Sequence, residues 1–126
     1  MNKTAVILVD HGSKIQAANR MLEEVASAFA KLGEYGIIKF AHMELCEPSL
    51  AQAIAACADA GVDTIIVHPY FLSPGRHSTN DIPRMVAEAA RAYPDIRCQV
   101  TEPLGLHPVM NQIILDRVRE TEQAMG

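Results

Sequence analysis

Residues 62–83, VDTIIVHPYFLSPGRHSTNDIP, hold a short apolar strand pattern followed at once by a polar loop, and this pairing decides the fold class. Ile65, Ile66 and Val67 form a β-branched run directly after Gly61, which is typical of a buried strand. The loop that follows, SPGRHSTND, is rich in turn residues and carries polar groups to one end of the sheet. The stretch therefore predicts a strand whose end displays candidate ligand-binding side chains.

Strand and helix patterns alternate along the whole chain. We predict strands at residues 5–9, 37–43, 65–67 and 96–100, and helices at residues 15–32, 48–60, 79–92 and from 108 onward. Ser13 and Gln16 match a capping box for the first helix, and Pro48 fits the first position of the second. Four such alternations indicate an α/β three-layer sandwich, with a mainly parallel four-stranded sheet of order 2-1-3-4 flanked by helices. Residues 1–126 are expected to form this single domain.

The last predicted helix carries more apolar residues than one narrow stripe requires. These residues are Met110, Ile113, Ile114, Leu115 and Val118. Two interpretations are open, because the surplus could form a subunit interface or an ordinary buried face.

Composition excludes several classes of protein. A net charge of −4 without a basic run argues against nucleic acid as a partner. No apolar run approaches the roughly 20 residues of a membrane span, and the N-terminal residues turn polar too soon for a secretory signal. The cytoplasm is therefore the expected compartment. Cys46, Cys57 and Cys98 are odd in number and widely spaced, so we interpret them as reduced packing residues.

Polar side chains follow all of the predicted strands. His11 leaves the first strand, Glu44 the second, His77 the third and Glu102 the fourth. Parallel sheets bind ligands beyond the carboxyl ends of their strands, where the strand order reverses, which here lies between strands one and three. Two imidazoles and a carboxylate suit a divalent transition metal. Taken singly, His11 could equally hydrogen-bond its turn, His77 could be a solvent-exposed loop residue, and Glu44 could be an acidic residue near a helix start.

The other three histidines have structural interpretations. His68 ends the buried run before Pro69, which favours a hydrogen-bonded core or inner-shell histidine. His42, late in the second strand, is ambiguous. His107 precedes Pro108 at a predicted helix start and is expected to order that turn.

Four segments in order, VILVDHGSK, MELCEPSL, VHPYFLSPGRHSTNDIP and VTEPLGLHPVM, resemble the short-chain sirohydrochlorin chelatase family, the small cobaltochelatases and siroheme ferrochelatases. The resemblance covers nearly the whole chain. It implies a chelatase-like half-domain that inserts divalent cobalt, iron or nickel into sirohydrochlorin or a related tetrapyrrole. His11 and His77 match the family's catalytic and metal-binding histidines, and Glu44 its acidic metal-site residue. A homodimer is also implied, and an iron–sulfur cluster is not.

The loop beside His77 is the expected binding surface for the flat macrocycle. Its candidate residues are Tyr70, Phe71, Leu72, Ser73 and Arg76, where the apolar side chains would supply surface and Arg76 charge. A non-catalytic metal or tetrapyrrole carrier on the same fold is the alternative function. A flavodoxin-like signalling receiver, suggested by Asp10, is disfavoured because His68 and Pro69 occupy the position where an accepting Asp would be needed, and because five βα units are not visible.

Overall fold

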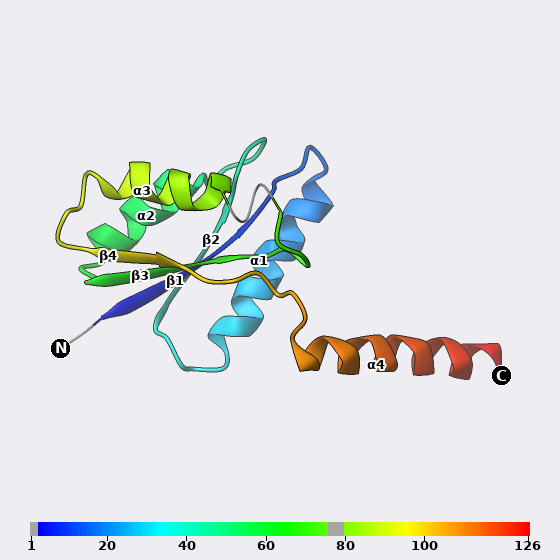
Figure 1. Ribbon diagram of the computed structural model, residues 1–126. Coiled ribbons are helices and arrows are strands. Elements are labelled where there is room, and N and C mark those ends of the chain that lie inside the picture. Colours follow the sequence, from blue (N-terminus) through cyan, green and yellow to red (C-terminus); the bar gives the residue numbers. More distant parts are fainter. Residues whose placement is uncertain (1–2, 76–79) are drawn as a thin grey trace.

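The computed structural model of the protein describes residues 3–75 and 80–126. Within these ranges four strands alternate with four helices, as the sequence predicts (Figure 1). The strands are β1 (Thr4–Asp10), β2 (Ile37–His42), β3 (Thr64–Pro69) and β4 (Arg97–Val100). The helices are α1 (Gln16–Ala30), α2 (Leu50–Asp59), α3 (Ile82–Ala90) and α4 (Pro108–Met125). Arg76 and His77, two of the predicted site residues, lie outside the described residues.

The described strands form one parallel sheet in the predicted order, β2-β1-β3-β4. β1 lies in the middle and pairs with β2 on one side and with β3 on the other. β4 pairs only with β3, which confirms that it is an edge strand. The carboxyl ends of β1 and β2 stand side by side, because Asp10 pairs with His42 in the register. The sheet therefore brings together the loops that carry His11 and Glu44.

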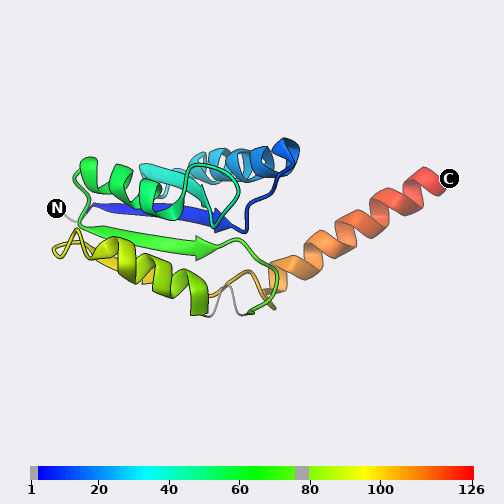
Figure 2. The ribbon, with the colours of Figure 1, turned by 90° about the horizontal axis from the view of Figure 1, so that it is seen from above.

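Helices cover both faces of the sheet, and side chains of β1 alternate between them. Ala5, Ile7 and Val9 belong to a large apolar cluster with α2 and α3, which lie above the sheet in Figure 1. Val6 and Leu8 belong to a smaller cluster with α1 on the opposite face. Figure 2, from above, shows β1 and β3 side by side in the sheet. The three-layer sandwich is confirmed, with a thinner covering on the α1 face.

The capping box predicted for Ser13 and Gln16 is wrong. The N-cap residue of α1 is Ile15, whose side chain has no acceptor for the first backbone N–H groups. Ser13 lies before this cap and is held by Asn19, whose Oδ1 accepts from Ser13 N at 3.0 Å and whose Nδ2 donates to Ser13 O at 2.7 Å. Buried Asn19 therefore orders the turn, because a polar side chain removed from water must be hydrogen-bonded.

The prediction that Pro48 opens the second helix is also wrong. α2 begins at Leu50, and Ser49 is its N-cap. A capping box is present here: Ser49 Oγ accepts from Gln52 N at 3.1 Å, and Gln52 Oε1 accepts from Ser49 N at 2.7 Å. Pro48 lies just before the cap, after a cis peptide bond with Glu47, and its carbonyl accepts a hydrogen bond from His42 N at 2.9 Å.

Helix α4 does not pack on the sheet or on the other helices that the structure describes. It extends away from the sheet in both ribbon views (Figures 1 and 2), and none of its residues is buried. The interpretation of its apolar side chains as an ordinary buried face within the chain is therefore wrong. His107 is its N-cap, as predicted, and Nδ1 accepts from Val109 N at 3.2 Å. Neither α4 nor any other helix in the described part of the chain is long and apolar enough to cross a membrane.

The three cysteines are free, as predicted. Cys57 is fully buried in the larger apolar cluster, and Cys98 packs against the same cluster. Burial raises the pKa of both thiols, which favours the neutral form. Cys57 and Cys98 therefore suit packing better than nucleophilic or metal-binding roles.

Candidate functional site

The loops after β1 and β2 are joined backbone to backbone at the carboxyl end of the sheet. Met43 N donates to Asp10 O at 2.9 Å, and Glu44 N donates to His11 O at 3.2 Å. These bonds continue the pairing of β1 and β2 beyond their last residues. They place the side chains of His11 and Glu44 together, with Nδ1 and Oε1 3.9 Å apart.

Gly12 lets the two loops approach so closely. Its φ is +93°, in the left-handed region, and a Cβ at this position would lie 1.9 Å from the carbonyl oxygen of Glu44. Only glycine combines that backbone conformation with that lack of volume. The HGS turn is therefore fitted to the loop that carries Glu44.

The side chains of His11 and Glu44 are both partly exposed, although Nδ1 of His11, the ring nitrogen nearest Glu44, is itself buried. The His11 side chain is 42% exposed and that of Glu44 58% exposed. An imidazole next to a carboxylate can bind a metal ion through both groups, or the carboxylate can orient the imidazole. The pair thus supplies two metal-ligand groups at an open edge, where a bound ion could still be released.

A second histidine–carboxylate pair lies directly beneath this edge. His42 is 1% exposed, and its Nδ1 lies 2.5 Å from Asp10 Oδ1. From the sequence alone, the role of His42 is ambiguous, and Asp10 suggests only the disfavoured signalling receiver. The signal that could have found the pair is the register, since the two residues end neighbouring strands. Asp10 precedes His11, so the pair braces the strand end that carries His11.

The other predicted site residues are dispersed. Tyr70 lines an apolar groove on the α1 face, and Phe71 packs against the larger apolar cluster. Leu72 and Ser73 are exposed, and Glu102 is exposed at the end of β4. Within residues 3–75 and 80–126 no group of three histidine, cysteine, aspartate or glutamate side chains is arranged to hold a metal ion. Of the predicted metal-site residues, His11 and Glu44 are therefore the two that the described part of the chain brings together.

His68 is hydrogen-bonded, as its predicted structural role requires. Its Nδ1 lies 2.7 Å from Thr101 Oγ1, whose hydroxyl donates to Glu102 O at 2.8 Å. Burial lowers the pKa of His68, and a hydrogen bond to the backbone of Glu102 offsets this in part. The neutral imidazole is therefore favoured in the folded protein.

The lowered pKa of His68 predicts weaker folding at acid pH. The unfolded chain binds a proton near its ordinary pKa of 6.5, and the folded chain does so only at lower pH, so stability falls as the pH drops below that value. In His68→Gln this contribution is absent. Urea denaturation at about pH 7.5 and about pH 5 should show a smaller loss of midpoint in the variant than in the wild type. An equal loss of midpoint in the variant and the wild type would show that His68 does not contribute to the loss of stability at acid pH.

Comparison with known proteins finds a family model and relatives that match most of this chain. The CbiX family model matches residues 5–121. A chloroplastic sirohydrochlorin ferrochelatase of Arabidopsis thaliana is 41% identical over 90% of this chain and 51% of its own length. A sirohydrochlorin cobaltochelatase of Methanopyrus kandleri is 32% identical over 92% of this chain and 95% of its own. The chain thus spans about half the length of the Arabidopsis relative and nearly all of the Methanopyrus relative.

Solved structures share the fold. The sirohydrochlorin chelatase SirB of Bacillus subtilis subspecies spizizenii, in complex with cobalt, superposes with a TM-score of 0.88 at 27% identity, over 94% of this chain and 50% of that one. A protein described as a CbiX protein of cobalamin biosynthesis, from Marinobacter aquaeolei VT8, gives 0.82 at 29% identity over 96% and 98% of the two chains. One of these structures is about twice as long as this chain, and the other has about its length.

Proposed function

Because this chain belongs to the CbiX family, that of the short sirohydrochlorin chelatases, we propose that it inserts divalent cobalt, iron or nickel into sirohydrochlorin or a related tetrapyrrole. The observation that carries the proposal is the His11–Glu44 pair, 3.9 Å apart at the carboxyl edge of the sheet. The family match covers both residues. The edge is also where sheets of this type bind their ligands.

The residue types fit the chemistry of metal insertion. The pyrrole N–H protons must leave while a partly desolvated metal ion is presented to the ring nitrogens. A neutral imidazole can accept such a proton or bind the ion. We assign these roles to His11 and His77, and assign Glu44 to the metal ion or to the orientation of His11. Fewer than four protein ligands leave the ion free to be transferred.

The macrocycle is proposed to lie over the loop between β3 and α3. Tyr70, Phe71, Leu72 and Ser73 with Arg76 form this surface in our proposal. Leu72 supports it best, because its side chain is 67% exposed beside the carboxyl end of β3. Phe71 is the weakest member, since its packing against the larger apolar cluster leaves less of it for a ligand.

We propose that the functional unit is a homodimer. Support comes from the relatives: one is about twice as long as this chain and another about equally long. Two copies of a short chain would match the size of one long chain. We also propose residues 1–126 as a single domain, which the family match over residues 5–121 supports. The cytoplasmic location stays a prediction, and cell fractionation would check it, because the Arabidopsis relative is named as chloroplastic.

An anaerobic absorbance assay with sirohydrochlorin and cobalt, iron or nickel tests the proposed activity. The protein is expected to accelerate insertion of at least one ion over the spontaneous rate. If it accelerates none, the chelatase proposal is overturned and the non-catalytic carrier is left. Binding of metal and macrocycle without acceleration would be the result that identifies a carrier.

Glu44→Ala is expected to raise the metal concentration needed for half-maximal rate by about tenfold, because removal of a metal-binding or orienting carboxylate typically costs 10- to 100-fold. The fold should be kept, since the side chain is 58% exposed. Glu34→Ala is the matched control, because Glu34 is also exposed but precedes β2, whereas Glu44 follows it. Equal metal dependence in both variants would contradict the role of Glu44, and gross loss of stability would make that role structural.

A further inference from the structure

Two polar side chains are buried in the part of the chain that the structure describes, and both lie beside the HGS turn, residues 11–13. Asn19 on α1 is 5% exposed, and His42 at the end of β2 is 1% exposed. Burying a polar group costs free energy unless hydrogen bonds replace those that it made to water. The partners of these two side chains therefore show what their burial achieves.

Asn19 takes a position on α1 where an apolar side chain would be expected. It begins the buried stripe of the helix, which continues with Leu22 and Ala26. Its amide group binds the backbone of Ser13 from both sides: Oδ1 accepts from Ser13 N at 3.0 Å, and Nδ2 donates to Ser13 O at 2.7 Å. Both polar atoms of the Asn19 side chain thus hold the last residue of the HGS turn.

His42 holds the other end of the turn. Its Nδ1 lies 2.5 Å from Oδ1 of Asp10, the residue directly before His11. A carboxylate oxygen only accepts hydrogen bonds, so Nδ1 of His42 donates. The side chain also packs against the turn itself, because a Cβ at Gly12 would lie 3.3 Å from the Cβ of His42. The turn is therefore held on both sides of His11.

His42 also closes the base of the loop that carries Glu44. The chain leaves β2 after His42 and returns beside it, where His42 N donates to Pro48 O at 2.9 Å and His42 pairs with Ser49 in a parallel bridge. One residue thus holds the end of β1 through its side chain and the loop after β2 through its backbone. The separation of His11 and Glu44 depends on both contacts.

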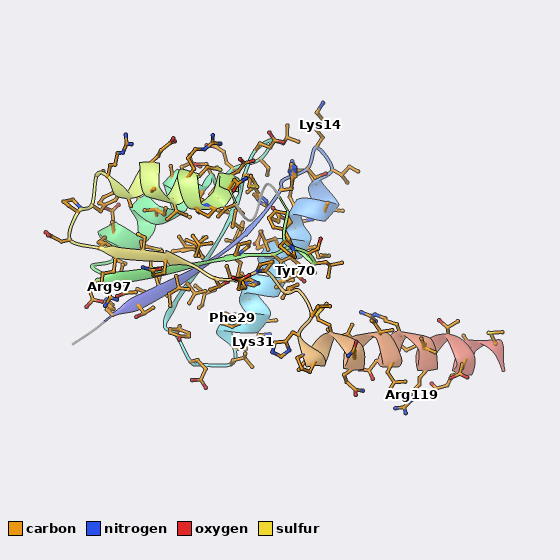
Figure 3. All side chains as sticks on the ribbon, in the orientation of Figure 1. Lys14, Phe29, Lys31, Tyr70, Arg97 and Arg119 are labelled. Carbon is orange, nitrogen blue, oxygen red and sulfur yellow. The ribbon has the colours of Figure 1, made fainter. Side chains whose placement is uncertain are left out.

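The outer side of the HGS turn faces solvent. Lys14, which follows the turn, is exposed and points away from the sheet in Figure 3. The His11 and Glu44 side chains are themselves 42% and 58% exposed, and a partly exposed pair of this kind adds little to stability. The position of the turn is therefore set from its buried side.

We propose, on the basis of the metal site of the proposed function, that Asn19 and His42 are positioning residues. They hold the two ends of the HGS turn and thereby keep His11 beside Glu44, without being ligands themselves. A pair of ligands that is already in place loses less freedom when an ion binds. Metal affinity should therefore fall when either residue loses its hydrogen bonds.

Titration of the full-length chain with cobalt(II), followed by calorimetry, tests this role without the macrocycle. Asn19→Leu and His42→Phe remove the hydrogen bonds and keep a buried side chain of similar size. Each should raise the Kd for cobalt(II) about tenfold, at the lower end of the effect of replacing groups that orient metal ligands. In His42→Asn the Kd should lie close to that of the wild type, because the asparagine Nδ2 can take the place of the histidine Nδ1 and donate to Asp10.

Leu22→Ala is the matched control for Asn19→Leu. Leu22 belongs to the same buried stripe of α1 and is 1% exposed, so loss of its side chain leaves a cavity and lowers the urea midpoint. Its Kd for cobalt(II) should equal that of the wild type. An equal rise of the Kd in this control would overturn the proposal. So would an unchanged Kd in Asn19→Leu and His42→Phe, or a Kd in His42→Asn as high as in His42→Phe.

Backbone amide relaxation measured by NMR reports the position of the turn without any metal. Order parameters of about 0.85 are expected at His11 and Gly12 in the wild type, and values below about 0.6 in Asn19→Leu and His42→Phe. Unchanged order parameters in both variants would show that neither residue holds the turn. A wild type that binds no cobalt(II), with order parameters that fall in the variants, would overturn the metal site of the proposed function and support the hold on the turn.

Discussion

Replacing His11 by alanine is expected to slow metal insertion by about 100-fold or more, the size of effect that a positioned proton acceptor provides. The imidazole lies beside Glu44, and at 42% exposure it contributes little to the packed interior. Stability should therefore change by less than about 1 kcal/mol. The rate is measured by the change in tetrapyrrole absorbance under anaerobic conditions, and stability by urea denaturation.

His107→Asn is the matched control for His11→Ala. His107 is another exposed histidine, but it caps α4, and asparagine is itself a good N-cap residue. The control should keep the wild-type rate. If His11→Ala also kept the wild-type rate, His11 could be neither a proton acceptor nor a metal ligand. If both variants lost activity equally, the effect would be a general sensitivity to histidine replacement and would contradict the assignment.

Gly12→Ala is expected to destabilise the protein by about 3 kcal/mol and to lower metal insertion at the same time. A residue with a Cβ pays about 1–2 kcal/mol for left-handed backbone. The added carbon would also overlap the carbonyl oxygen of Glu44, at 1.9 Å, so the loop after β2 must shift. Urea denaturation measures the loss of stability, and the insertion assay under native conditions measures the displacement of Glu44.

Substitutions at two other glycines separate the backbone cost of Gly12→Ala from its steric cost. Gly61 has a φ of +79°, but a Cβ added there would meet open space, so Gly61→Ala should cost only the backbone part, about 1 kcal/mol. Gly36 has neither restriction, and Gly36→Ala should be nearly neutral. Equal destabilisation by Gly12→Ala and Gly61→Ala would show that the contact with Glu44 is unimportant.

The sequence predicted the sheet because apolar periodicity reports burial directly. The continuous run at residues 5–9 indicated a central strand, and the alternation at residues 96–100 indicated an edge strand, as observed. Helix starts were predicted less well, since several nearby residues can cap a helix and tertiary contacts choose among them. Ser13 is held by Asn19, and Ser49 rather than Pro48 caps α2. These choices depend on neighbours that periodicity does not identify.

The part of the candidate site that directly follows the ends of the strands could be predicted from the sequence. His11 and Glu44 leave adjacent parallel strands, so their proximity follows from the strand order. The His42–Asp10 pair was missed because it depends on the register of β1 against β2, which the apolar pattern leaves open. The course of α4 was also beyond prediction. Its apolar residues could be recognised, but a pattern does not say whether the covering surface belongs to the same chain.

The unequal covering of the sheet has a consequence for how the molecule opens. The interior formed with α2 and α3 contains many more buried residues than the interior formed with α1. Local opening needs less free energy where fewer apolar contacts are lost. Among the helices that pack on the sheet, α1 should therefore open more readily than α2 and α3. His11 lies between β1 and α1, so the candidate site lies at the boundary between a part of the sheet sandwich whose amide hydrogens should exchange slowly and a part whose amide hydrogens should exchange faster.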